Sequence, residues 1–141
     1  NRGGALLKLT SQGGRTAAAR VYHTRDMKNQ HGGMAIVDGF LYGSSDGGGL
    51  TCLALKTGRV AWRARGAGKG SITIADGNIY LRTERGPIIL AEVSSTAYRE
   101  LGRFDQPNRS STPAWAHPVV ADGKLFIRDQ QLLLCYDVRG K

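Results

Sequence analysis

The stretch MAIVDGFLYGSS, residues 34–45, recurs twice along the chain in altered form and decides how the chain folds. ITIADGNIYLRT occupies residues 72–83, and PVVADGKLFIRD occupies residues 118–129. In each copy an alternating apolar run leads into Asp-Gly, and a second alternating run follows. Asp and Gly both tolerate the positive φ angles of a two-residue hairpin turn. We therefore predict three equivalent β-hairpins, which turn at Asp38-Gly39, Asp76-Gly77 and Asp122-Gly123.

A third apolar run follows every hairpin, and a fourth follows two of them. The third runs are LTCLAL (50–55), PIILAEV (87–93) and LLLCYDV (132–138), and the fourth runs are RVAWRAR (59–65) and YRELGRF (98–104). Short alternating runs bounded by turn residues are typical of strands. Units of four antiparallel strands that recur along a chain are the blades of a β-propeller.

The repeats divide the chain into two complete units and two partial ones. We predict an all-β protein, a partial β-propeller in which residues 1–30 form a partial blade, 31–66 and 67–112 form blades, and 113–141 form a partial blade that lacks its fourth strand. An open stack of blades leaves apolar faces uncovered. The expected partners are therefore the remaining blades of a longer parent protein or a partner chain.

Composition excludes several classes of function. The net charge is +9, but the 20 Lys and Arg residues are scattered without a basic run, which makes nucleic acid an unlikely partner. No apolar stretch is long enough for a membrane helix. Cys52 and Cys135 occupy the same place in different repeats, so a disulfide between them is improbable.

The segment CLALKTGRVAW, Cys52–Trp62, resembles the repeat of the pyrroloquinoline-quinone (PQQ) type propellers, in which Ala, Asp, Gly and Trp recur. Ala54, Gly58 and Trp62 match this pattern, and Lys56 stands where Asp is usual. On this resemblance Gly58 turns the chain between the third and fourth strands. Trp62 would then pack between blades as a structural wedge, because a large ring covers much apolar surface.

The resemblance extends over nearly the whole chain, through RDMKNQHGG (25–33), YRELGRF (98–104) and PAWAHPVVADGKLFIRDQQLLLCYDV (113–138). These segments look like the C-terminal portion of exported bacterial PQQ-like repeat proteins. That group is related to the quinoprotein dehydrogenases and to the propeller lipoprotein of the outer-membrane β-barrel assembly machinery. The resemblance implies a periplasmic or extracellular protein, although this sequence shows no signal-peptide pattern.

Fold resemblance alone does not establish an enzyme, because function resides in sites. A quinoprotein dehydrogenase is expected to carry adjacent cysteines, a Ca²⁺ site of Glu, Asn and Asp, and a catalytic Asp. The sequence contains neither an adjacent cysteine pair nor such an oxygen-rich cluster. We therefore predict no catalytic residue, no metal ligand and no cofactor. PQQ and Ca²⁺ enter only under the alternative of a dehydrogenase fragment whose cofactor residues lie on missing blades.

Residues that lead into the innermost strand of each blade should converge on the central funnel, where propeller ligands commonly bind. In repeat register these residues are His31, Lys69, Trp115 and His117. Together they offer charge and stacking for an anionic or aromatic ligand. The competing interpretation is that they are solvated loop residues or packing between blades.

Arg82 and Arg128 occupy matching second-strand positions beside Glu84 and Asp129. We expect local ion pairs on the strand surface there rather than a basic lining. The sequence as a whole favours a non-catalytic binding or scaffold module. The dehydrogenase fragment is one alternative, and a polysaccharide- or polyanion-binding propeller is another.

Overall fold

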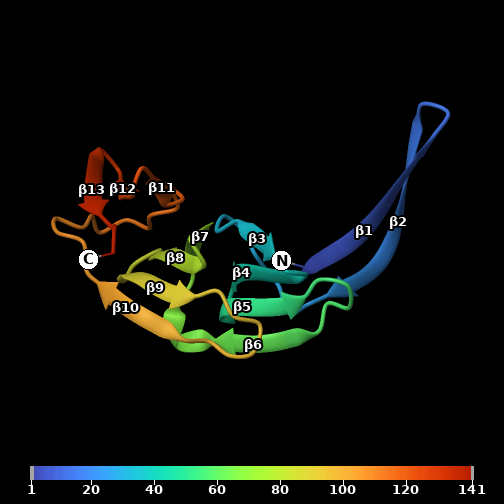
Figure 1. Ribbon diagram of the computed structural model, residues 1–141, viewed down its shortest axis with the longest axis horizontal. Helices are drawn as coiled ribbons and strands as arrows, with labels where there is room; N and C mark the ends of the chain where they lie inside the picture. Colours follow the sequence, from blue (N-terminus) through green and yellow to red (C-terminus); the bar gives the residue numbers. More distant parts are fainter. Residues whose placement is uncertain (1, 141) are drawn as a thin grey trace.

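The computed structural model describes residues 2–140, and its strands form four separate antiparallel sheets (Figure 1). Two sheets are complete, each with four strands in the order of the chain. A third sheet has three strands, and the first two strands of the chain pair only with each other. The prediction of an all-β partial propeller built from four-stranded antiparallel blades is confirmed.

The strands of the complete sheets follow the repeat units along the chain. The first complete sheet contains β3 (Met34–Val37), β4 (Phe40–Ser45), β5 (Gly49–Ala54) and β6 (Val60–Ala64). A 3₁₀ turn, η1 (Arg65–Ala67), leads to β7 (Gly70–Ala75), β8 (Asn78–Thr83), β9 (Ile88–Glu92) and β10 (Glu100–Phe104). The third sheet contains β11 (Val119–Ala121), β12 (Lys124–Asp129) and β13 (Leu132–Asp137). The finer division into blades at residues 30, 66 and 112 stays a prediction.

Each Asp-Gly pair lies at the turn between the first two strands of its sheet. Both residues of each pair have positive φ, with 48° and 78° at Asp38-Gly39, 48° and 73° at Asp76-Gly77, and 51° and 68° at Asp122-Gly123. Positive φ at both central residues defines a type I′ turn, and the twist of this turn matches that of the flanking strands. The same local chemistry therefore sets the register of all three hairpins.

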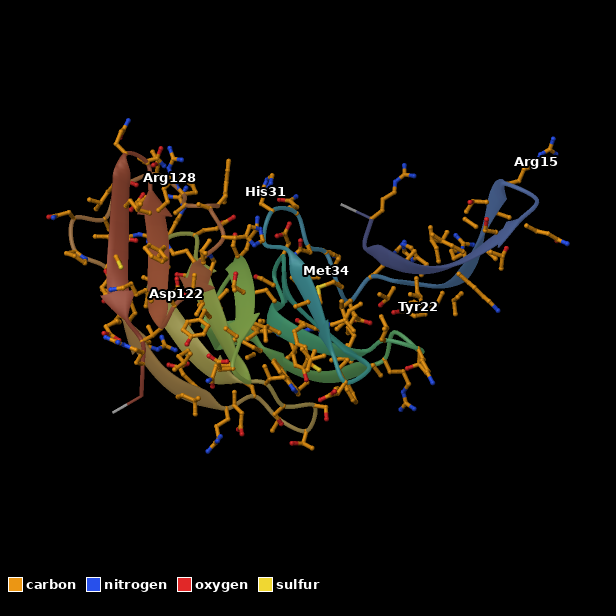
Figure 2. All side chains as sticks on the ribbon, turned by 45° about the horizontal axis from the view of Figure 1, so that its top comes forward. Arg15, Tyr22, His31, Met34, Asp122 and Arg128 are labelled. Carbon is orange, nitrogen blue, oxygen red and sulfur yellow. The ribbon has the colours of Figure 1, made fainter. Side chains whose placement is uncertain are left out.

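The long hairpin of β1 (Gly4–Gln12) and β2 (Arg15–Thr24) extends away from the other sheets (Figure 1). Figure 2 places Arg15 at its far end and Tyr22 near its base. A Cβ at Gly58 would come within 2.5 Å of the Tyr22 ring, and Gly58 has a φ of 70°. Because glycine has no Cβ, the turn between β5 and β6 can lie against the Tyr22 ring. The base of the β1–β2 hairpin therefore packs closely against the first complete sheet.

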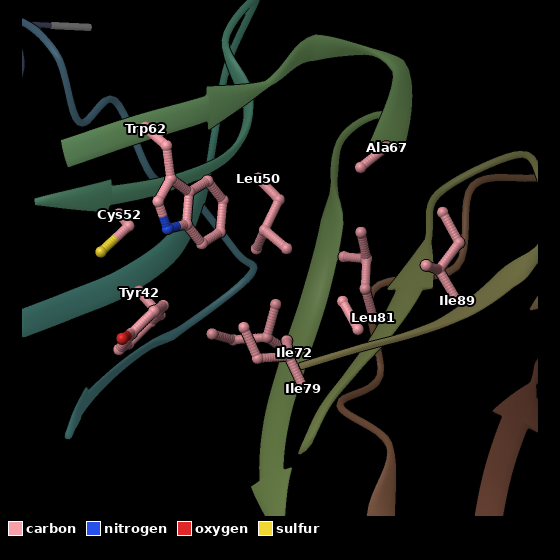
Figure 3. Close-up of a cluster of buried hydrophobic side chains, with 10 residues drawn as sticks. Tyr42, Leu50, Cys52, Trp62, Ala67, Ile72, Ile79, Leu81 and Ile89 are labelled. Atoms are coloured by element: carbon pink, nitrogen blue, oxygen red, sulfur yellow. The ribbon is translucent and has the colours of Figure 1, made fainter. Parts of the chain in front are cut away.

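The main apolar core lies between the two complete sheets (Figure 3). Its buried members include Tyr42, Leu50 and Trp62 from the first sheet, and Ile79 and Leu81 from the second. The packing of Trp62 here agrees with the wedge role that the PQQ-repeat resemblance implies. Among residues 2–140 the structure holds no helix long and apolar enough to cross a membrane.

A smaller core lies between the second and third sheets, around Tyr80, Ile88, Leu125 and Ile127. Arg82 is fully buried beside this core. Its ion-pair partner is Asp129 of the third sheet at 3.6 Å, so the expectation of a local pair with Glu84 on the strand surface was wrong. The sequence distance between Arg82 and Asp129 hid this pair, because only the packing of two sheets brings the residues together.

Candidate functional site

The four residues predicted for the funnel come from three loops, and the structure brings them together. Figure 2 shows His31 in the loop that leads into β3. The His31 ring stacks on the Trp115 ring with a centroid distance of 4.7 Å and an interplanar angle of 26°. His117 places Nε2 3.0 Å from the His31 carbonyl oxygen and Nδ1 3.2 Å from the Ile72 carbonyl oxygen. His117 therefore connects the chain segments at the beginning of β3, β7 and β11, the innermost strands of the three sheets.

Lys69 lies between two carboxylates from different sheets. Its Nζ is 3.0 Å from Asp46 Oδ1 and 3.1 Å from Glu84 Oε1, and it donates a hydrogen bond to the Gln30 side-chain oxygen at 3.2 Å. The hydrogen bond with Asp46 is the main cause that raises the pKa of Lys69 above its ordinary value. The positive charge of Lys69 is therefore already balanced by protein groups.

Glu84 joins the lysine to the tryptophan. The Trp115 indole nitrogen donates a hydrogen bond to Glu84 Oε1 at 3.0 Å, and this is the oxygen that Lys69 also approaches. The main chain adds two links, since the Glu84 amide donates to the Lys69 carbonyl and the Ala114 amide donates to the Glu84 carbonyl. Trp115 is consequently held on both its ring face and its ring nitrogen.

His117 depends on a glycine beside it. A Cβ at Gly33 would lie 2.3 Å from His117 Cε1, and Gly33 has a φ of 65°. Both ring nitrogens of His117 face carbonyl oxygens, which accept hydrogen bonds but do not donate them. A neutral imidazole has a single N–H, so it serves one of the two carbonyls at a time.

Sequence reasoning missed Asp46 and Glu84 as members of this cluster. A signal was present, because each stands eight positions after the aspartate of its Asp-Gly turn, and Gln130 occupies the equivalent place in the third sheet. We call the set His31, Asp46, Lys69, Glu84, Trp115 and His117 the funnel cluster. Members from different sheets are one another's ion-pair, hydrogen-bond and stacking partners.

The funnel cluster leaves one large apolar group open to solvent. Trp115 is 51% exposed and borders a hollow of about 350 Å³ that Arg128 and Gln131 also line. A fixed indole beside a guanidinium and an amide offers stacking, charge and hydrogen bonding to an incoming ligand. Within residues 2–140, three or more His, Cys, Asp or Glu side chains nowhere gather in a way that would hold a metal ion.

The four-stranded antiparallel sheets, the equivalent Asp-Gly hairpins and the repeat signature together define a PQQ-like β-propeller. Residues 4–108 match the family described as outer membrane protein assembly factor BamB, and the chain belongs to this family. The crystal structure of BamB from Moraxella catarrhalis shares the fold, with a TM-score of 0.53 and 15% sequence identity. The match covers 85% of this chain and 50% of that chain, so this chain spans about half the length of the solved BamB. No curated protein matches the chain.

Proposed function

We propose that this chain is a non-catalytic protein-binding scaffold segment of an exported, BamB-like propeller that acts in the periplasm during outer-membrane protein assembly. The observation that carries the proposal is Trp115, which is half exposed and yet held by the His31 ring and the Glu84 carboxylate. Binding hot spots are enriched in Trp and Arg, and a side chain that is already fixed loses little entropy when a partner binds.

The polar groups of the funnel cluster support a scaffold better than an anion-binding pocket. Lys69 is balanced by two carboxylates, and both nitrogens of His117 face main-chain oxygens. These contacts connect sheets and would hold a binding surface in a fixed shape. The proposed role requires neither PQQ nor Ca²⁺. His31, Lys69 and His117 would act by positioning, and Trp115 would contact the partner.

Site-specific photocrosslinking in the bacterium tests this role. A crosslinking amino acid at position 115 of the parent protein should give an adduct with a component of the outer-membrane assembly machinery. The same residue at position 101, where Leu101 is 45% exposed on the outer strand β10 of a complete sheet, provides the matched control. Equal adducts at both positions, or none at 115, would contradict the proposal.

A second candidate function, polyanion binding, rests on a different surface. Arg2, His23, Arg25 and Lys28 line a hollow of about 470 Å³ at the base of the β1–β2 hairpin. In the described part of the chain, ion pairs form at Arg63, Lys69, Arg82, Arg99, Arg103 and Arg139, and none forms at these four residues. Salt-sensitive retention on a sulfated polysaccharide column, lost in Arg25→Ser, would favour this function.

A further inference from the structure

The boundary between the second and third sheets lacks the large ring that fills the boundary between the first two. In the first complete sheet Trp62 on β6 lies opposite Cys52 on β5. In the second complete sheet Gly102 on β10 lies opposite Leu90 on β9. A glycine therefore occupies the place of the tryptophan.

The strand register shows that these two positions are equivalent. Cys52 pairs with Tyr42 in the first sheet. Leu90 pairs with Tyr80 in the second sheet, and each tyrosine stands four positions after the Asp of its Asp-Gly turn. The pairing of each outer strand also skips one residue just before the position concerned. This shared bulge aligns the glycine of β10 with the tryptophan of β6.

The missing ring leaves an apolar hollow of about 200 Å³ between the second and third sheets. Apart from its chain neighbours, nothing in the described part of the chain lies within 4 Å of a Cβ added at Gly102. Five residues that line the hollow correspond in the repeat to members of the main apolar core. They are Tyr80, Ile88, Leu90, Leu125 and Val138.

Phe104 on β10 lines the same hollow but does not fill it. Its ring contacts the Tyr136 ring of the third sheet, with a centroid distance of 4.8 Å and an interplanar angle of 62°. Phe104 is 38% exposed, and Gly102 beside the hollow is exposed as well. A ligand can therefore enter the hollow from the side of β10.

The hollow offers almost no charge to a ligand. Within residues 2–140, Arg103 is the one charged residue that lines it. The Arg103 guanidinium donates hydrogen bonds to both carboxylate oxygens of Glu100. A charged ligand in this hollow would lose its hydration without gaining a partner, so a neutral ligand is favoured.

We propose that this hollow binds a small, uncharged aromatic compound of indole size. The equivalent boundary indicates the occupant, because the indole ring of Trp62 fills the corresponding space there. An engineered apolar cavity of about 150 Å³ in another protein binds benzene, so a hollow of this size accepts an aromatic ring. The rings of Tyr80 and Phe104 favour an aromatic ligand over an aliphatic one. This site is separate from the funnel cluster and does not depend on the role proposed for Trp115.

Calorimetric titration of the whole chain with indole tests the site. We expect one binding site per chain, with a dissociation constant of about 0.1 to 1 mM from the apolar area that an indole ring would bury. Indole should also raise the unfolding midpoint with its concentration, because it binds the folded state. The absence of saturable binding up to the solubility limit of indole would overturn the proposal.

A variant that fills the hollow should no longer bind indole. Gly102→Trp supplies the missing ring at a position without positive φ, and its unfolding midpoint should rise by about 2 to 8 °C, as for other cavity-filling substitutions. Leu101→Trp is the matched control, because Leu101 is 45% exposed and does not line the hollow. The control should bind indole with unchanged affinity. Equal affinity in Gly102→Trp and the unchanged chain would contradict the assignment.

Methyl NMR of the unchanged chain locates the ligand even if a variant fails to fold. Indole should shift the methyl signals of Ile88, Leu90 and Leu125, and it should leave Leu9 unchanged. Leu9 is 65% exposed on β1, so shifts of equal size there would show adsorption to apolar surfaces in general and overturn the proposal. The parent protein should show the same shifts. Their absence would mean that other residues of the parent fill the hollow, which would also overturn the proposal.

Discussion

The indole nitrogen of Trp62 lies 2.6 Å from the carbonyl oxygen of Ser94, and this hydrogen bond joins the two complete sheets. The same ring lies between Tyr42 and Tyr98, with centroid distances of 6.1 and 5.8 Å. Only 8% of Trp62 is exposed. One residue therefore contributes apolar burial, aromatic contact and a hydrogen bond to the same boundary.

Replacement of Trp62 should consequently destabilise the chain more than replacement of other aromatic residues. Trp62→Ala should cost about 3 to 5 kcal/mol, the usual range for removing a large buried aromatic side chain. Trp62→Phe keeps part of the ring contact and should cost about half as much. Urea unfolding followed by circular dichroism measures both. A loss below about 1 kcal/mol for Trp62→Ala would show that the wedge role is wrong.

Alkaline pH should destabilise the core between the two complete sheets through Tyr42. Burial, followed by interaction with Cys52, raises the pKa of Tyr42 from 10.0 to about 12. Because the folded-state value lies above the unfolded one, the stabilisation is complete below pH 10 and is lost as the pH rises toward 12. Unfolding free energies measured across this window should fall less steeply for Tyr42→Phe than for the unchanged chain. Parallel pH profiles would contradict the prediction.

The hairpins were predictable because their signal is local. Asp38-Gly39 and its two equivalents specify the turn, and alternation on either side specifies which residues face inward. Repeat register also predicted that His31, Lys69, Trp115 and His117 lie near one another, since each precedes an inner strand. Their role as ligand contacts stays a prediction.

The partners of these residues were not predictable in the same way. The contacts of Asp46 and Glu84 with Lys69 join different loops. Which residues of these loops meet depends on how far one sheet is rotated relative to the next. Arg82 was misassigned for the related reason that its carboxylate belongs to another sheet. Sequence alternation fixes the face on which a side chain lies, but it does not identify the residue opposite on the neighbouring sheet.

Gly33→Ala should displace His117 and loosen the link between the three loops. An added Cβ would lie 2.3 Å from His117 Cε1, and the positive φ of Gly33 adds backbone strain. Gly39→Ala is the matched control, because Gly39 also has positive φ but nothing lies within 4 Å of an added Cβ. Both variants should lose about 1 kcal/mol from strain, and Gly33→Ala should lose about 1 to 3 kcal/mol more. Equal losses in thermal unfolding would show that His117 relaxes freely.

The two cysteines should differ sharply in reactivity. Both are free thiols, with Cys52 buried and Cys135 exposed on β13. Burial raises the pKa of the Cys52 thiol, which further reduces its nucleophilic thiolate form. Brief alkylation of the folded chain followed by mass spectrometry should label Cys135 alone, and urea should make both sites reactive. Rapid labelling of Cys52 without denaturant would indicate that the core between the complete sheets opens readily.

Lys69 and Glu84 should be energetically coupled, because the lysine lies between the loops of two sheets. The pair is 3.1 Å apart, and the side chains of Lys69 and Glu84 are 31% and 20% exposed, so solvent screens the attraction only in part. A double-mutant cycle with Lys69→Met and Glu84→Gln should give a coupling of about 0.5 to 1 kcal/mol, and molar salt should reduce it. Asp46→Asn in place of Glu84→Gln should give a similar value, since Asp46 approaches the same ammonium at 3.0 Å. Coupling to one carboxylate alone would mean that Lys69 stabilises a single sheet. Coupling to both would mean that the lysine stabilises the junction on which the position of Trp115 depends.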